Sequence, residues 1–191
     1  LCIPFVAALL LLGDTGSSLV LAGVLFMVVA YSLKGLRFKE RPVLDSITSS
    51  VHFVGPLVYA LSLFGFPDAA WPYVLAFFAW GMASHAFGAV QDVIPDREGG
   101  IHSIATVFGA RWTVRLSVIL YGLSSLLLFT TGPAGAVVGV AGLIYVLNCL
   151  PYVRLSDGES GQANKAWRRF IWLNLFTGAV LTIALILNRT W

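Results

Sequence analysis

Seven apolar stretches alternate with polar segments along the 191 residues of this chain. They lie near 1–12, 17–33, 46–65, 71–90, 112–131, 133–152 and 168–188, and the first is the shortest. About 20 consecutive apolar residues form a helix long enough to cross a hydrocarbon layer about 30 Å thick. The pattern therefore predicts an all-α, polytopic transmembrane bundle with about seven spans, forming a single domain over residues 1–191.

The polar segments between these stretches are of two kinds. Three are short and rich in turn-forming residues, namely 13–16, 65–68 and 131–133. The other three are long, and they cover 34–45, 91–111 and 153–167. Because short and long segments alternate, the three long loops are predicted to lie on one side of the membrane. Within the last of them, residues 156–161 are predicted to form an exposed linker.

Charge placement predicts which side that is. The chain is 58% hydrophobic and 11% charged, which excludes an ordinary soluble domain, and we expect no nucleic-acid partner. All Lys and Arg residues except Arg189 lie in or beside the long loops: Lys34, Arg37, Lys39, Arg41, Arg97, Arg111, Arg115, Arg154, Lys165, Arg168 and Arg169. Loops rich in Lys and Arg remain in the cytoplasm. The long loops are therefore predicted to be cytoplasmic and the C-terminus to lie outside.

The longest polar segment carries two carboxylates four residues apart, Asp92 and Asp96. Pro95 disfavours helix at the residue before it, so the preceding helix is expected to kink or a new one to begin. Carboxylates one turn apart suit Mg²⁺, which commonly bridges protein carboxylates to substrate phosphates. As an alternative, Asp92 could cap a helix while Asp96 pairs with Arg97 or Arg111. We favour a Mg²⁺ site because capping needs only one carboxylate.

The loop at 34–45 offers the complementary charge. Its basic residues include Arg37 and Lys39, which follow Tyr31 at the end of a span. Arg and Lys near a metal would stabilise the charge that develops on a diphosphate leaving group. Attraction to anionic lipid headgroups would also account for several of these residues. Beside the aspartate pair, diphosphate binding by Arg37 and Lys39 is the favoured interpretation.

A few polar residues lie within the apolar stretches. Three of them share one helical face: Asp45, Ser49 and His52. His52 and His85 are predicted to be hydrogen-bonded core residues. The functional alternative is that one of them acts as a base or a polar contact near the acceptor substrate. Asn148 and Asn174 are predicted to form hydrogen bonds between helices.

Together these motifs resemble the UbiA family of intramembrane prenyltransferases. Asp92-Val-Ile-Pro-Asp96 is similar to that family's second aspartate motif, DxxxD, and Gly109-Ala-Arg111 to its usual continuation. The segment from Tyr31 to Lys39 resembles the tyrosine–basic motif, although Lys34-Gly35 replaces two common prolines. The resemblance implies nine helices around a cavity open to the cytoplasm. It further implies that Asp92 and Asp96 are catalytic and hold Mg²⁺, and that Tyr31, Arg37 and Lys39 bind a prenyl diphosphate.

Residues 36–46 and 84–98 more narrowly resemble the lycopene elongase branch. That branch implies prenyl transfer from dimethylallyl diphosphate to lycopene or a related carotenoid, in a bacterial plasma membrane. An aromatic quinone precursor or another polyprenoid remains an alternative acceptor. A cation-binding transporter is a further alternative, but it should carry ionisable residues near mid-span, whereas charge here lies at helix ends. A structural membrane subunit without chemistry is the third class.

The chain departs from the family in one respect. The first aspartate motif, NDxxDxxxD, is not found in this sequence. Seven spans, with Leu1 cytoplasmic and Trp191 outside, would correspond to helices three to nine of the nine-helix fold. We therefore expect the 191-residue chain by itself to be inactive, because half of the expected metal ligands are missing.

Overall fold

The computed structural model describes residues 2–187, and these form helices with no strand among them. The α-helices are α1 (Ile3–Leu12), α2 (Thr15–Ser32), α3 (Leu44–Leu63), α4 (Trp71–Val90), α5 (Val93–Glu98), α6 (Ile104–Phe129), α7 (Pro133–Cys149) and α8 (Asn164–Leu187). Short 3₁₀ helices join them: η1 (Phe38–Glu40), η2 (Asp68–Ala70), η3 (Leu150–Tyr152) and η4 (Asp157–Ala163). The all-α prediction is confirmed.

Six of these segments are long and apolar enough to cross a membrane. They contain α2, α3, α4, α6, α7 and α8. The remaining expected span, the first in the chain at 1–12, contains only α1 among the described residues. The ten residues of this helix extend about 15 Å. The polytopic architecture is therefore confirmed, whereas α1 is too short to cross the membrane as a straight helix.

Most of the expected spans match the observed helices, but α6 begins eight residues before its predicted start. Ser103 starts the helix with a capping box, in which its side chain accepts from the Thr106 N–H and the Thr106 side chain accepts from the Ser103 N–H. Gly109 then interrupts the helix, with φ 79° and ψ 161°. The predicted loop 91–111 thus consists of α5, a short connection and the first turns of α6.

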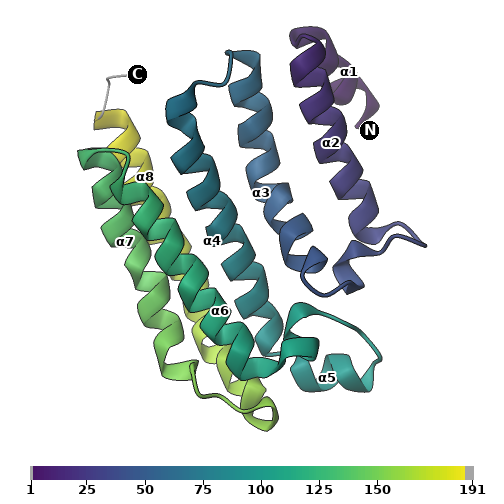
Figure 1. Cartoon of the computed structure of the whole chain (residues 1–191), viewed down its shortest axis with the longest axis vertical. Helices are drawn as coiled ribbons and strands as arrows, with labels where there is room; N and C mark the ends of the chain where they lie inside the picture. The colour runs from purple at the N-terminus through teal and green to yellow at the C-terminus, as the bar shows by residue number, and fades with distance from the viewer. Residues whose placement is uncertain (1, 188–191) are drawn as a thin grey trace.

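Figure 1 shows the spans in chain order from α2 in purple to α7 in green, with α8 in yellow returning behind α6 to lie next to α7 and α4. Helices adjacent in this order pack against each other, from α2·α3 through α3·α4, α4·α6 and α6·α7 to α7·α8. The connections corresponding to the three long loops all lie at the lower ends of the spans in Figure 1, where α5 lies crosswise below α3. The fold therefore brings most of the charged residues to one end.

The best-packed part of the bundle lies among α4, α6, α7 and α8. Phe87 and Val90 of α4, Val114 and Tyr121 of α6, and Tyr145 of α7 belong to one buried cluster. Val93, the first residue of α5, is also fully buried within it. The short helix α5 is thus anchored to the core by an apolar side chain next to Asp92.

Asn148 and Asn174 join helices as predicted. Asn148 Nδ2 donates to the carbonyl of Ala166 at 3.1 Å, and the Tyr145 hydroxyl donates to Asn174 Oδ1 at 2.7 Å. Both bonds connect α7 with α8. Residues 156–161 are exposed at most positions, as predicted, but they are not an irregular linker, because they form most of η4, which begins with a capping box between Ser156 and Glu159.

Candidate functional site

The aspartate pair sits where one helix ends and another begins. α4 ends at Val90 and α5 starts at Val93, so the new helical start expected beside Pro95 is observed. Asp92 occupies the N-cap position of α5, yet its side chain makes no capping hydrogen bond. The Asp96 N–H donates to the Asp92 carbonyl at 2.9 Å, which fixes the two residues one turn apart. The capping alternative for the Asp92 carboxylate is therefore wrong.

Both carboxylates bind protons more tightly than an ordinary aspartate. Partial burial raises the pKa of Asp92 above its usual 3.8, and a side-chain hydrogen bond with Gln91 partly offsets this. Burial also raises the pKa of Asp96, and the negative charge of Asp92 raises it further. Two carboxylates that repel each other this way are expected to gain from a shared cation.

Arg97, the neighbour of Asp96, is held elsewhere. Its Nη1 forms an ion pair with Asp157 Oδ2 at 2.7 Å, and its Nε and Nη2 donate to the Thr106 carbonyl at 2.9 and 2.6 Å. Arg111 forms no ion pair within residues 2–187. The alternative in which Asp96 pairs with Arg97 or Arg111 is therefore wrong, and neither cation neutralises the aspartate pair directly.

Asp157 also binds the backbone of α6 where the helix resumes after Gly109. Its Oδ1 accepts from the Ala110 N–H at 2.7 Å, directly after Gly109. A Cβ at Gly109 would lie 2.9 Å from this same oxygen, so the close approach requires glycine. One carboxylate from η4 thus joins α5, through Arg97, to the second part of α6.

A second carboxylate holds the first turn of α6. Asp45, in the first turn of α3, is fully buried, and its Oδ2 accepts from the Ile104 N–H at 2.7 Å. Its Oδ1 accepts from the Ser46 N–H at 2.7 Å. The Ser46 hydroxyl lies 3.2 Å from His85 Nδ1, which bonds α3 to α4. The prediction of a hydrogen-bonded core histidine is thus confirmed for His85.

The candidate diphosphate ligands lie on the adjoining basic segment. Tyr31, near the end of α2, packs its ring edge-on against His52 with 5.1 Å between ring centroids. Arg37 has a left-handed backbone, with φ 41°, and pairs with Glu40. Lys39 lies exposed in η1, which packs against α2 and α3.

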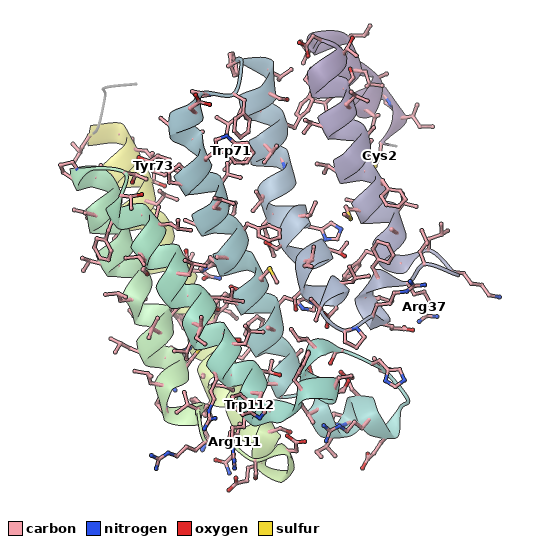
Figure 2. All side chains as sticks on the ribbon, viewed as in Figure 1. Cys2, Arg37, Trp71, Tyr73, Arg111 and Trp112 are labelled. Carbon is pink, nitrogen blue, oxygen red and sulfur yellow. The ribbon has the colours of Figure 1, made fainter. Side chains whose placement is uncertain are left out.

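The structure brings these two groups to one end of the molecule without direct contact. Figure 2 shows Arg37 at the same end of the bundle as Arg111, and α5 lies at that end in Figure 1. No hydrogen bond or ion pair joins Arg37 or Lys39 to the aspartate pair within residues 2–187.

The donor set is compatible with Mg²⁺ but small. Asp92 and Asp96 supply carboxylate oxygens, the ligand type that Mg²⁺ prefers, and neither is neutralised by an ion pair in the described part of the chain. No group of three or more His, Cys, Asp or Glu side chains suited to a metal occurs within residues 2–187. A cation there would take its remaining ligands from water and substrate oxygens.

Comparison with known proteins identifies the family. The sequence model of the UbiA prenyltransferase family matches residues 1–175. This chain belongs to the UbiA prenyltransferase family. The UbiA match includes both Tyr31–Lys39 and Asp92–Asp96, so the resemblance seen in those motifs is confirmed at the family level.

Individual relatives give a narrower similarity. The chain is 47% identical over 186 residues to a protein named lycopene elongase/hydratase from Corynebacterium glutamicum, covering 96% of this chain and 65% of that protein. It is 42% identical over 185 residues to the C(50) beta-cyclic carotenoids biosynthesis protein LbtBC of a Dietzia species, covering 94% and 42%. It is 38% identical over 93 residues to a lycopene elongase/hydratase of Haloferax volcanii, covering 49% and 31%. No solved structure matches this UbiA chain.

Three interactions around the site had escaped sequence reasoning. The bonds from Asp45 to Ile104, from Arg97 to Thr106 and from Asp157 to Ala110 all join residues far apart or across a turn. A buried acid at a helix start was the one available signal, since Asp45 precedes an apolar span. Nothing local to the sequence indicates that Asp157 bonds a residue 47 positions away.

Proposed function

We propose that the complete protein transfers a prenyl group from a prenyl diphosphate, with dimethylallyl as the expected group, to lycopene or a related carotenoid. The chain spans 65% of the length of the Corynebacterium relative and 42% of the Dietzia relative, so this activity is proposed for the whole protein. The observation that carries the proposal is the pair of unneutralised carboxylates on α5 at the same end as the basic segment.

In this proposal Asp92 and Asp96 hold Mg²⁺. The ion would neutralise diphosphate oxygens as the bond between carbon and oxygen breaks. Because the pKa values of both carboxylates are raised, protons compete with the metal for their oxygens. The expected loss of turnover in the isolated 191-residue chain remains a prediction, and prenyl transfer by this chain alone would contradict it.

Arg37, Lys39 and Tyr31 are proposed to bind the diphosphate. Arg37 presents a planar fork that suits phosphate oxygens, Lys39 adds a point charge, and the Tyr31 hydroxyl can donate one hydrogen bond. The ring contact between Tyr31 and His52 would fix the direction of that hydroxyl. Positive charge from Mg²⁺ together with that of Arg37 and Lys39 would stabilise the negative charge that develops on the departing diphosphate.

The reaction then follows from charge balance. Loss of diphosphate leaves an allylic cation, and the terminal alkene of the carotenoid forms a new bond between two carbons. The resulting cation ends by losing a proton or by gaining water and losing a proton. The names of the relatives include both elongase and hydratase. Cytoplasmic placement of the charged end is part of the proposal, supported by its basic residues.

The first experiment expresses the complete protein in a lycopene-producing bacterium and separates the pigments by chromatography and mass spectrometry. We expect C45 or C50 carotenoids, and we expect Asp92→Asn to remove them while leaving the amount of protein in the membrane unchanged. Glu98→Gln is the matched control, because Glu98 is an exposed acid on the same short helix. Unchanged lycopene with normal membrane abundance would exclude the carotenoid acceptor and direct the test to aromatic quinone precursors.

A further inference from the structure

A second group of basic side chains lies at the charged end of the bundle, on different elements from the aspartate pair. We call it the arginine cluster, and its members are Arg111, Arg115, Arg154 and Arg169. Arg111 and Arg115 are one turn apart on α6, Arg154 follows η3, and Arg169 lies in the second turn of α8. In Figure 2, Arg111 and Arg37 project from opposite sides of this end. The cluster is therefore separate from the segment proposed to bind diphosphate.

Hydrogen bonds hold two members of the cluster, Arg115 and Arg169, against one short segment. Arg115 Nε donates to the Val153 carbonyl at 3.1 Å, which connects α6 with residue 153. Arg169 Nη2 donates to the Tyr152 hydroxyl at 3.2 Å, which connects α8 with residue 152. Arg154 follows directly in the chain. Guanidinium groups from α6 and α8 thus bond residues 152 and 153, directly before Arg154.

No ion pair within residues 2–187 neutralises this positive charge, although Arg111 lies near enough to Asp157 to help lower the pKa of that carboxyl. The ion pairs within residues 2–187 join Arg37 to Glu40 and Arg97 to Asp157, and neither involves the cluster. The acids of the adjacent η4 are already engaged, since Asp157 also caps Ala110 and Glu159 bonds Ser156. Three of the four cluster side chains are exposed: Arg111, Arg154 and Arg169. They retain donors that can bind an external anion.

Apolar and aromatic surface continues from the cluster along the spans. Trp112, next to Arg111, is 62% exposed, and its ring lies 4.7 Å from the Arg115 guanidinium carbon. Trp172, three residues after Arg169 on α8, is 72% exposed. Tryptophan at the end of a span is typical of the interface between headgroups and hydrocarbon. Exposed tryptophan therefore lies beside the arginine cluster on both α6 and α8.

We propose that the arginine cluster binds the headgroup of an anionic phospholipid. The phosphate would accept hydrogen bonds from the exposed guanidinium groups, while the acyl chains would lie against the apolar faces of α6 and α8. Basic pockets between the cytoplasmic ends of transmembrane helices are suited to such headgroups. This site is independent of prenyl transfer, and its test does not require an active enzyme.

The test uses the purified, delipidated protein in neutral detergent and native mass spectrometry. Equal amounts of phosphatidylglycerol and phosphatidylcholine of the same acyl composition are added, and the fraction of protein retaining each lipid is measured. We expect preferential retention of phosphatidylglycerol. Arg111→Gln and Arg154→Gln should each weaken it about fivefold, since one cation near the surface contributes about that factor. Both side chains are exposed, and neither makes a hydrogen bond within residues 2–187, so folding should be preserved.

Two control variants distinguish specific binding at the arginine cluster from nonspecific attraction between anionic lipid and a positively charged protein. Arg154→Lys preserves the charge and should retain most of the binding. Lys34→Gln removes one exposed charge from the other basic segment and should leave phosphatidylglycerol retention unchanged. Equal retention of the two lipids, or an equal loss in Lys34→Gln, would overturn the proposal. Displacement of the lipid by millimolar inorganic phosphate would also overturn it, because the site would then be one for a soluble anion.

Discussion

Arg97 and Asp157 form an ion pair across 60 positions of sequence, with 2.7 Å between Nη1 and Oδ2. Both side chains are more than one third exposed, so the charge interaction alone contributes at most about 1 kcal/mol. The ion pair matters more through the backbone groups that its two residues also bond. Arg97 bonds the Thr106 carbonyl and Asp157 bonds the Ala110 N–H, so together they support both sides of the interruption in α6. Asp96 directly precedes Arg97, so the pair also restrains the helix that carries the proposed metal ligands.

Replacing Gly109 by alanine should disturb this arrangement. The backbone at Gly109, with φ 79° and ψ 161°, is one that glycine alone adopts readily, and a Cβ would lie 2.9 Å from Asp157 Oδ1. We expect Gly109→Ala to lower the free energy of unfolding by about 1–3 kcal/mol, measured by thermal unfolding in detergent. Gly122→Ala is the control, since that position lies within α6 with no atom within 4 Å of the added Cβ. Equal unfolding temperatures for the two variants would contradict the argument.

Asp45 should matter through the backbone groups that it binds. Asp45→Ala would leave the buried Ile104 N–H without its acceptor, at an expected cost of about 1–3 kcal/mol. Asp45→Asn retains one oxygen acceptor, so its loss should be smaller. Asp68→Asn, at an exposed position in η2, should leave the unfolding temperature unchanged. If Asp45→Ala unfolds at the same temperature as the unmodified protein, then Asp45 does not stabilise the start of α6.

The aspartate pair predicts a specific pH dependence. Because the pKa values of Asp92 and Asp96 are raised in the folded state, that state binds protons more tightly than the unfolded chain. Without metal, the stability contributed by these groups should therefore fall as pH rises from the usual aspartate pKa of 3.8 through the raised values. The effect is small, because both groups remain partly solvated. With Mg²⁺ present the trend should reverse, since protons and metal compete for the same oxygens.

This dependence can be assigned by comparing variants. Unfolding temperatures would be measured between about pH 4 and about pH 7, with a chelator and with Mg²⁺. Asp96→Asn should reduce the pH dependence in the chelator and abolish most of the stabilisation by Mg²⁺. Glu98→Gln, on the same helix, should do neither. If the unfolding temperature of Asp96→Asn varies with pH in parallel with that of the unmodified protein, both in chelator and in Mg²⁺, then Asp96 does not bind the metal.

The sequence predicted the features of this protein that depend on local pattern. Apolar length indicated the spans, and Pro95 after Asp92 indicated the new start at α5. The early start of α6 was not predicted, and part of what holds its first turn, the bond to Asp45 across 59 positions, leaves no local signal. The capping box at Ser103 was a local signal that could have found it.

Polar composition did not predict which polar segments have a fixed backbone or which charged side chains form pairs. Residues 156–161 contain Gly, Ser and acids, which indicated a linker, yet their backbone is fixed by the Ser156–Glu159 capping box and by the bonds of Asp157. The candidate site could be located because charges are scarce in this chain. Which cation holds which anion could not be predicted, since the pairing of Arg97 with Asp157 depends on how α5 and η4 pack.

The last prediction concerns the pairing of Arg37 with Glu40. In the structure Glu40 forms an ion pair with the guanidinium group of Arg37 that is proposed to bind diphosphate. The two side chains are 50% and 30% exposed, so breaking the pair costs about 0–1 kcal/mol and substrate can displace Glu40. Glu40→Gln should therefore lower the KM for dimethylallyl diphosphate by up to about fivefold. Arg37→Gln should raise it about tenfold or more, because charge-assisted bonds to phosphate are lost.

Steady-state kinetics of the complete protein in lycopene-containing vesicles would measure both effects. Lys165→Gln is the matched control, since it removes one exposed positive charge at the same end of the bundle, at the start of α8. A KM that rises in Arg37→Gln and falls in Glu40→Gln, with little change for Lys165→Gln, would place Arg37 on the diphosphate. If both substitutions in the pair raise KM equally, the pair instead maintains the conformation of the basic segment, and Lys39 becomes the stronger candidate for the phosphate contact.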